Sequence, residues 1–317
     1  MVEQLDIILA AWAVDPAVDA VLVRSASERA FCAGGDVRSI GILSDPSKRM
    51  SLGRTFFSTE YRVNWRINTL SKPFIALIGG IALGGGLGIS VHGSHRIVSE
   101  TLRLAMPETL IGLFPDVGAT WFLTRCPGAI GRYLALTGLN IGAADALAAG
   151  LATQHVPSSE FSALTADLSS APKLDGALVD STVTRYAAPA ESGSISERAA
   201  EIDRLFGADD LDTVFAQVGR ASNTAAWIGE AYTALRRASP TSLRVTWRRM
   251  VEGRNQSIEQ ILEDDFRVAV RMVGNHDFAE GVRAILVDKD EAPRWNPTSL
   301  AEVTEADAAA LLAPLDR

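Results

Sequence analysis

The chain has 317 residues, of which 47% are hydrophobic and 21% are charged, so it can bury a sizeable core in one large or two smaller domains. Its 38 acidic residues outnumber its 30 basic ones, and the net charge of −8 argues against a dedicated nucleic-acid-binding protein. Two cysteines and four histidines without metal-ligand spacing predict neither a disulfide framework nor a metal site.

The composition also bears on location. The sequence contains no apolar run of about 18 residues, the length that a membrane-spanning helix needs. Its first residues have neither the basic segment and apolar stretch of a signal peptide nor the Arg- and Ser-rich composition of a transit peptide. We therefore expect a soluble protein of the cytoplasm that binds no membrane and no nucleic acid.

The first half of the chain alternates predicted helices and strands. Apolar residues at helical spacing predict a helix over 2–12 and another over 62–70, whereas residues 38–61 are polar and irregular and indicate a mobile helical segment. Short apolar or β-branched runs predict strands over 18–23, 74–78, 96–98 and 102–105. This alternation of strand, loop and helix is typical of an α/β fold.

The second half has a different pattern. Residues 158–195 are rich in Ser, Ala and Pro and have few aromatic side chains, which indicates a variable linker region. The remaining pattern is mostly helical, with predicted helices over 202–206, 212–218, 224–238, 242–251 and 257–273. We therefore predict a core over 1–157, a linker region over 158–195 and a mostly helical C-terminal region over 196–317.

Two glycine-rich loops each follow a predicted strand. The first contains Gly34 and Gly35, and the second is the run 79–88, with Gly84, Gly85 and Gly86 at its centre. Glycine lets the backbone approach a ligand closely, and the first amides of a helix are unpaired donors, so such loops can hold a phosphate or a developing oxyanion. The run fits a dinucleotide fingerprint poorly, and tight packing of a helix on a strand is the structural alternative.

Two acidic residues stand in the apolar stretch 106–118. Glu108 and Asp116 lie eight positions apart, and a carboxylate among apolar neighbours tends to have a raised pKa, which suits acid–base chemistry. The structural alternatives are a helix-first-turn acid beside Pro107 for Glu108 and the N-cap of a helix that starts at Val117 for Asp116.

These segments together resemble the crotonase (enoyl-CoA hydratase/isomerase) superfamily, and more narrowly its 3-hydroxyisobutyryl-CoA hydrolase branch. The resemblance lies in Ala-Phe-Cys-Ala-Gly-Gly-Asp (30–36), Gly-Gly-Gly-Leu-Gly-Ile-Ser-Val-His-Gly (84–93) and Met-Pro-Glu-Thr-Leu-Ile-Gly-Leu-Phe-Pro-Asp-Val-Gly (106–118). Segments 239–243, 277–284 and 287–290 resemble the same branch, and only 158–211 is unmatched in detail. The resemblance implies a crotonase-like α/β fold, which is a spiral of ββα units followed by a helical C-terminal region.

The resemblance also implies a site. The substrate would be an acyl-CoA thioester, with no other cofactor, and the backbone amides of Gly35 and Gly85 would form the oxyanion hole for its carbonyl. Ala33 and Arg38 are candidate CoA contacts, and Arg29 and Lys72 are further basic candidates because they lie near the loops in the sequence. Cys32 is interpreted as a small packing residue, because no basic partner is placed to activate it.

The residues at two positions distinguish a hydratase from a thioester hydrolase. Hydratases of the superfamily use two glutamates, one at the position of Gly88 here and one at that of Glu108, so this chain keeps only the second. The hydrolase branch has an aspartate at the position of Asp116. We therefore expect hydrolysis of a short 3-hydroxyacyl-CoA, 3-hydroxyisobutyryl-CoA in valine breakdown above all. An enoyl-CoA hydratase or isomerase and a non-catalytic acyl-CoA-binding member are the alternatives.

Three points stay open at this stage. Glu108 would act either as a nucleophile or as a general base, and Asp116 would either hold the 3-hydroxyl group or manage the proton on the departing thiolate. Family members usually have a strand pair before the first helix, whereas this sequence begins at that helix. Either the given start is late, or the protein dispenses with those strands and leaves an open edge on the first sheet. The superfamily often forms trimers, and we leave the choice between a monomer and a homo-oligomer open.

Overall fold

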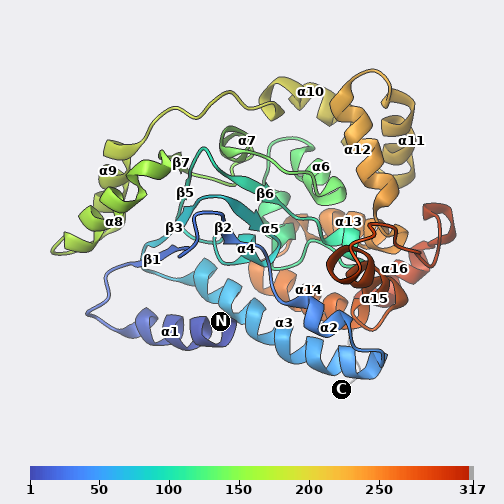
Figure 1. Ribbon diagram of the computed structural model, residues 1–317, viewed down its shortest axis with the longest axis horizontal. Helices are drawn as coiled ribbons and strands as arrows, with labels where there is room; N and C mark the ends of the chain where they lie inside the picture. Colours follow the sequence, from blue (N-terminus) through green and yellow to red (C-terminus); the bar gives the residue numbers. More distant parts are fainter. Residues whose placement is uncertain (314–317) are drawn as a thin grey trace. The chain divides into compact units, whose positions relative to one another are not determined.

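The computed structural model describes residues 1–313 (Figure 1), and contacts within the chain divide it into two units. Unit 1 consists of Met1–Gly34, Thr59–Ala105 and Asn140–Arg198. Unit 2 consists of Gly35–Ser58, Met106–Leu139 and the described residues from Ala199 onward. Each unit is thus built from segments far apart in the sequence, unlike the consecutive parts that the composition suggested. None of the described helices is long and apolar enough to span a bilayer.

Two parallel sheets form the centre of unit 1. One has four strands in the order β1-β3-β5-β7, and the other has three in the order β2-β4-β6. Successive strands alternate between the sheets, so each turn of the chain adds one strand to each. This is the spiral of strand pairs that the resemblance predicted. The strands are β1 (Val21–Arg24), β2 (Ala30–Cys32), β3 (Phe74–Ile78), β4 (Ile81–Leu83), β5 (His95–Val98), β6 (Arg103–Ala105) and β7 (Gln154–His155).

The change from one sheet to the other requires glycine at one point. Only Gly79 and Gly80 separate β3 from β4, and Gly80 has a φ of +69°. A Cβ atom on Gly80 would overlap the carbonyl group of Arg29, the residue before β2. The backbone therefore turns here in a left-handed conformation and at a contact distance that a side chain would not allow.

Short helices surround these sheets within unit 1. The helical elements of this unit are α1 (Val2–Val14), α4 (Gly85–Gly88), α7 (Ala143–Ala148), the 3₁₀ turn η2 (Ser158–Glu160), α8 (Phe161–Ser170) and α9 (Gly176–Tyr186). Two further helices, α3 (Pro46–Thr69) and α10 (Ile195–Phe206), have residues in both units.

The segment 158–195 contains α8 and α9, so the prediction of a linker region there was wrong. Leu164 and Leu168 of α8 and Val179 and Val183 of α9 are buried in one hydrophobic cluster with strand residues such as Ile75. Figure 1 shows the two helices side by side. Their apolar residues recur four positions apart, but the many Ser and Ala residues between them hid this helical period.

The polar segment 38–61 is also more regular than predicted. It forms α2 (Val37–Gly41) and most of α3, a helix of 24 residues. Its polar composition suggested a solvent-exposed segment, but several of its polar side chains are buried together with their bonding partners. Arg49, for example, is buried and donates hydrogen bonds to the carbonyl groups of Leu43, Val273 and Gly274.

Unit 2 is almost entirely helical, as the pattern beyond residue 196 predicted. Helix α13 packs against α5, α6 and α16, and α11 lies beside α12 (Figure 1). Its elements are α2, η1 (Glu108–Ile111), α5 (Ala119–Leu123), α6 (Ile130–Thr137), α11 (Leu211–Ala221), α12 (Ala226–Arg237), α13 (Pro240–Glu252), η3 (Gly253–Asn255), α14 (Ile258–Met272), α15 (His276–Val282), the π-helical turn η4 (Arg283–Val287), η5 (Leu300–Glu302) and α16 (Glu305–Leu312).

Candidate active site

The three motifs that the sequence singled out begin at one edge of the three-stranded sheet. Strands β2, β4 and β6 are parallel, so their carboxyl ends lie at the same edge. The chain runs from β2 into residues 33–36, from β4 into residues 84–88 of the glycine run and from β6 into the stretch 106–118. Ligand sites of α/β sheets usually form outside the carboxyl ends of the strands, which supports the choice of these loops.

The first two loops contact each other through backbone. Gly34 has a φ of +101°, and a Cβ atom there would lie 3.5 Å from the carbonyl oxygen of Leu83 and 4.0 Å from the amide nitrogen of Gly85. A Cβ atom on Gly86 would overlap the carbonyl oxygen of Cys32. The two glycine loops therefore meet, although the strands directly before them, β2 and β4, were not predicted from the sequence. Gly35, the second proposed oxyanion donor, is the next residue along the chain.

Gly85 is the first residue of α4, and Gly84 precedes it with a φ of +49°. Amides in the first turn of a helix lack partners within the helix, so the Gly85 N–H is the kind of donor that an oxyanion hole needs. The helix is only four residues long. Gly88 is its last residue and is buried, so no carboxylate stands at the position of the first hydratase glutamate.

Cys32 and Glu60 are close enough to interact. Burial raises the pKa of the Cys32 thiol, and the nearby Glu60 carboxylate raises it further. A protonated thiol agrees with the interpretation of Cys32 as a packing residue. Glu60, a buried acid close to Cys32, was not predicted from the sequence. It shares a buried face of α3 with Phe57 and Tyr61, but its burial is visible only in the structure.

Glu108 is the first residue of the 3₁₀ helix η1, which begins three residues after β6. This place agrees with the structural alternative of an acid in the first turn of a helix. However, Glu108 is only 6% exposed, and an acid that merely stabilises a helix end does not need to be buried. Backbone contacts fix the turn that begins at Glu108. The carbonyl group of Glu108 accepts a hydrogen bond from the amide of Leu113, and Gly112 ends the turn with a φ of +69°.

The C-terminal segments that resemble the hydrolase branch hold η1 in place. The carbonyl oxygen of Thr109 accepts a hydrogen bond of 3.0 Å from the amide of Ser239. The Ser239 hydroxyl donates to the Asp277 carboxylate at 2.6 Å. A Cβ atom on Gly112 would overlap the backbone of Asp277, so η1 packs directly on the start of α15. Residues 239 and 277 thus support the backbone that carries Glu108.

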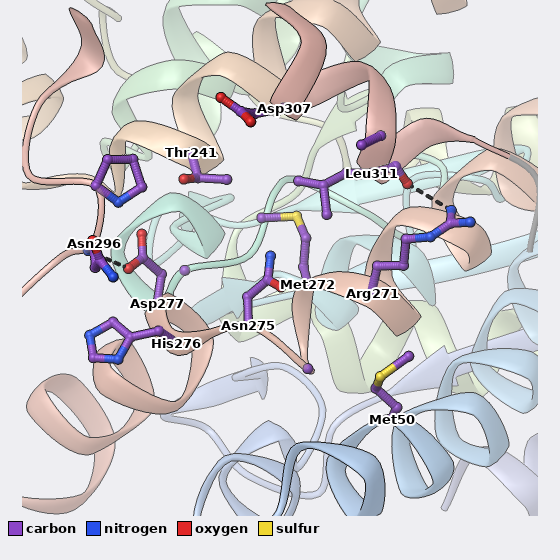
Figure 2. Close-up of a pocket in the computed structure, with 14 residues that line it drawn as sticks. Met50, Thr241, Arg271, Met272, Asn275, His276, Asp277, Asn296, Asp307 and Leu311 are labelled. Carbon is purple, nitrogen blue, oxygen red and sulfur yellow. Dashed lines mark hydrogen bonds between the residues drawn. The ribbon is translucent and has the colours of Figure 1, made fainter. Parts of the chain in front are cut away.

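Asp277 also lines a cavity of about 590 Å³ within unit 2 (Figure 2). Its carboxylate accepts a hydrogen bond of 2.8 Å from the amide of Asn296, and burial raises its pKa. Of the residues in the stretch 106–118, Gly112 alone lines this cavity, together with Met50, Thr241, Arg271, Met272, Gly274, Asn275, His276, Asp277, Asn296, Pro297, Asp307, Ala310 and Leu311.

Asp116 is 4% exposed and does not cap a helix. Helix α5 begins at Ala119 with Gly118 as its N-cap, so the structural alternative for Asp116 was wrong. Instead, the carbonyl group of Asp116 accepts a hydrogen bond of 2.8 Å from Ala119 across a tight turn. Both central residues of this turn, Val117 and Gly118, have positive φ values of 53° and 76°, as in a type I′ turn.

The candidate CoA contacts differ in what they do. Lys72 donates to the carbonyl groups of Trp12 and Asp15 at 2.6 and 2.5 Å, and thereby holds the end of α1. Ala33, Arg38 and Arg29 are exposed, and their contact with CoA stays a prediction. Among residues 1–313, no three His, Cys, Asp or Glu side chains gather into a group that could hold a metal ion.

A protein-family model described as enoyl-CoA hydratase/isomerase matches residues 1–312. The chain belongs to this family. It is 40% identical over 299 residues to the mitochondrial 3-hydroxyisobutyryl-CoA hydrolase of Danio rerio, covering 93% of this chain and 77% of that protein. Identity to the human enzyme of the same name is 36%, covering 97% and 80%. Identity to 3-hydroxyisobutyryl-CoA hydrolase 1 of Arabidopsis thaliana is 38%, covering 96% and 82%.

Solved structures of the family have the same fold. A carnitinyl-CoA dehydratase from Mycobacterium thermoresistibile superposes with a TM-score of 0.89 and 37% identity, covering 99% of this chain and 89% of that one. An enoyl-CoA hydratase from Rhodobacter sphaeroides gives a TM-score of 0.86 and 37% identity, covering 99% and 90%. The predicted crotonase-like fold is therefore confirmed, and the protein is an enzyme of this family.

Proposed function

We propose that the protein hydrolyses the thioester of 3-hydroxyisobutyryl-CoA, giving 3-hydroxyisobutyrate and CoA as a step of valine breakdown. The observation that carries this proposal is the set of side chains in the motifs. Gly88 stands where a hydratase needs its first glutamate, while Glu108 and Asp116 are both present and buried. The names of the curated relatives with 36–40% identity support the same reaction.

The chemistry begins at the thioester carbonyl. The amides of Gly35 and Gly85 stabilise the negative charge that develops on the carbonyl oxygen, and a single donor of this kind typically contributes about 10²–10³-fold to the rate. These donors are backbone groups, so they bring no charged side chain that would need water or a counter-ion.

Glu108 serves this step by one of two routes. As a nucleophile, its carboxylate attacks the carbonyl carbon and expels the CoA thiolate, which takes up a proton, and water then hydrolyses the mixed anhydride. As a general base, it takes a proton from a water molecule that attacks the carbonyl carbon directly. Label found in the Glu108 carboxylate after a single turnover in isotopically labelled water would establish the anhydride route, because attack of water on the Glu108 carbonyl of the anhydride is the only step that places it there.

Asp116 gives the reaction its preference for a 3-hydroxyacyl group. A buried carboxylate can accept a hydrogen bond from the substrate 3-hydroxyl, and a substrate without that hydroxyl leaves the carboxylate without this bond. A second role, managing the proton that the departing thiolate needs, predicts instead that Asp116→Ala slows hydrolysis of every thioester to the same extent.

A second function deserves a test because of the solved relatives. The Rhodobacter sphaeroides protein of similar fold is named an enoyl-CoA hydratase, and that reaction would add water to the double bond of crotonyl-CoA. The absence of a carboxylate at Gly88 argues against it, since hydration in this superfamily uses two glutamates.

One set of assays separates these functions. Purified protein is given 3-hydroxyisobutyryl-CoA, isobutyryl-CoA and crotonyl-CoA, and both thiol release and loss of the double bond are followed. We expect thiol release that is fastest with the hydroxylated substrate and no hydration of crotonyl-CoA. Hydration without thiol release would instead assign the enzyme to the hydratases, and binding without either reaction would make it a non-catalytic member. The cytoplasmic location stays a prediction, which cell fractionation tests. The choice between a monomer and a homo-oligomer stays open, and light scattering decides it.

A further inference from the structure

The turn that carries Asp116 has an unfavourable backbone. Val117 is β-branched and has a φ of +53°, in the left-handed region that such residues rarely adopt. Val117 is also buried, so the turn is not a flexible surface feature. Strained conformations of this kind persist only where the surrounding structure imposes them, and they cluster at functional sites.

One side chain from a distant part of unit 2 bonds directly to this turn. The amide of Gly118 donates a hydrogen bond of 2.9 Å to Oδ2 of Asp265, a residue of α14. Asp265 is 0% exposed, so no water competes for this bond. The acceptor therefore fixes the position of the peptide that follows Val117, two residues from Asp116.

Arg249 of α13 fixes Asp265 in turn. Its Nη2 atom lies 3.0 Å from Oδ1 of Asp265, and its Nη1 atom lies 2.7 Å from Oδ2 of Asp264. Arg249 is 1% exposed, so this ion pair is buried at both ends. Asp264 has further partners in Gln256 and Arg267, but it has no bond to the turn among the contacts that the structure describes.

A buried ion pair is a weak source of stability, because taking two charges out of water offsets most of their attraction. The cost is visible at Asp265, where burial raises the pKa to about 6 although Arg249 and the Gly118 amide oppose the change. A costly pair that bonds to a strained turn is better explained by the geometry it imposes than by the stability it adds.

We propose that Asp265, held by Arg249, is a positioning residue that fixes the turn 116–119 and thereby sets the enzyme's selectivity for a substrate with a 3-hydroxyl group. This inference rests on the proposed function, because it assigns to Asp265 a role that is exerted through Asp116. Asp265 itself does not touch the substrate in this account.

A double-mutant cycle tests the inference. The kcat/KM values for 3-hydroxyisobutyryl-CoA and isobutyryl-CoA are measured for the wild type, Asp116→Ala, Asp265→Asn and the double variant. Asp265→Asn should reduce the preference for the hydroxylated substrate by about 10²-fold, since small misplacements of a functional group cost that much. In the Asp116→Ala background the same change should alter kcat/KM by less than about twofold, because its only route of action is gone.

Asp264→Asn is the matched control. It removes the other carboxylate that pairs with Arg249 and leaves the bond to Gly118 in place, so the preference for the hydroxylated substrate should stay within about twofold of wild type. Asp265→Glu keeps the buried charge but moves the acceptor by one methylene group. If circular dichroism shows that Asp265→Asn does not fold, Asp265→Glu takes its place in the cycle and should lower the preference for the hydroxylated substrate.

The outcomes separate the two proposals. Equal losses for both substrates, or the same effect of Asp265→Asn with and without Asp116, would mean a purely structural role and would overturn this inference alone. A wild-type enzyme that hydrolyses neither thioester would overturn the proposed function and this inference with it.

Discussion

Gly86 and Gly88 both belong to the single turn of α4, but the absence of a side chain has a different consequence at each. At Gly86 it permits a contact, because the backbone lies against Cys32, the last residue of β2. At Gly88 it removes a reaction, because a hydratase would carry its first glutamate there. The sequence alone suggested the second point, whereas the first depends on a neighbour more than 50 positions away and needed the structure.

Gly86→Ala tests the contact between the loops. The new Cβ atom would overlap the carbonyl oxygen of Cys32, and neither backbone can move without shifting its loop. We expect kcat/KM for thiol release to fall by about 10²-fold, since the loops carry the proposed oxyanion donors. Gly176→Ala is the control, because a Cβ atom there meets nothing within 4 Å, and it should leave the rate unchanged. Full activity of Gly86→Ala would show that the loop contact is unimportant.

At the scale of elements, the helices and strands with a clear apolar pattern were predicted well. Helices that are rich in Ser and Ala, or that bury polar side chains, were predicted less well. Strand β3 agrees with its prediction because it is a continuous apolar run, and helices α11 to α14 agree because their apolar residues recur at a helical period. The pattern failed for α8 and α9, where Ser and Ala dilute that period. For α3 it indicated a helix but not burial, because the buried Arg49 looks like a surface residue in the sequence.

Leu164→Ala tests whether α8 belongs to the core. Leu164 is 0% exposed in the cluster with Ile75 and Val179. Removing its side chain should lower the free energy of unfolding by about 2–5 kcal/mol, from lost burial and the cavity left behind. Leu178→Ala in the same segment is the control, because Leu178 is 37% exposed and should cost less than about 1 kcal/mol. Equal, small effects of both substitutions in a urea titration would restore the linker interpretation.

The attachment of α1 should depend on pH. Asp6 of α1 pairs with Arg62 and Arg66 of α3 at 2.7 and 2.6 Å. Burial raises the pKa of Asp6, but the hydrogen bonds from the two arginines outweigh this and lower it below its ordinary 3.8. The pair therefore stabilises the fold above pH 3.8 and loses this contribution as the pH falls through the lowered pKa.

Asp6→Asn should remove that pH dependence. Compared with wild type, the variant should be less stable by about 1 kcal/mol at neutral pH, a usual size for exposed ion pairs. The difference should vanish below the lowered pKa, where Asp6 of the wild type is also uncharged. Thermal denaturation over this pH range measures it, and a difference that stays constant with pH would contradict the assignment.

At the scale of the whole molecule, only those site residues that lie in short sequence motifs could be predicted. The glycine loops, Glu108 and Asp116 stand in short motifs, and the order of the parallel strands places the start of each motif at one sheet edge. Glu60 and Asp265 could not be found in this way. Asp265 bonds to a residue 147 positions away, and nothing in the sequence around it marks that partner.

The most direct test of the proposed function is the initial rate of CoA thiol release from 3-hydroxyisobutyryl-CoA by the wild type and by Glu108→Gln. The glutamine has the shape of the glutamate but can act neither as nucleophile nor as base. We predict steady thiol release by the wild type and a rate lower by at least about 10²-fold for the variant. No release by the wild type, or release by Glu108→Gln at the wild-type rate, would contradict the account.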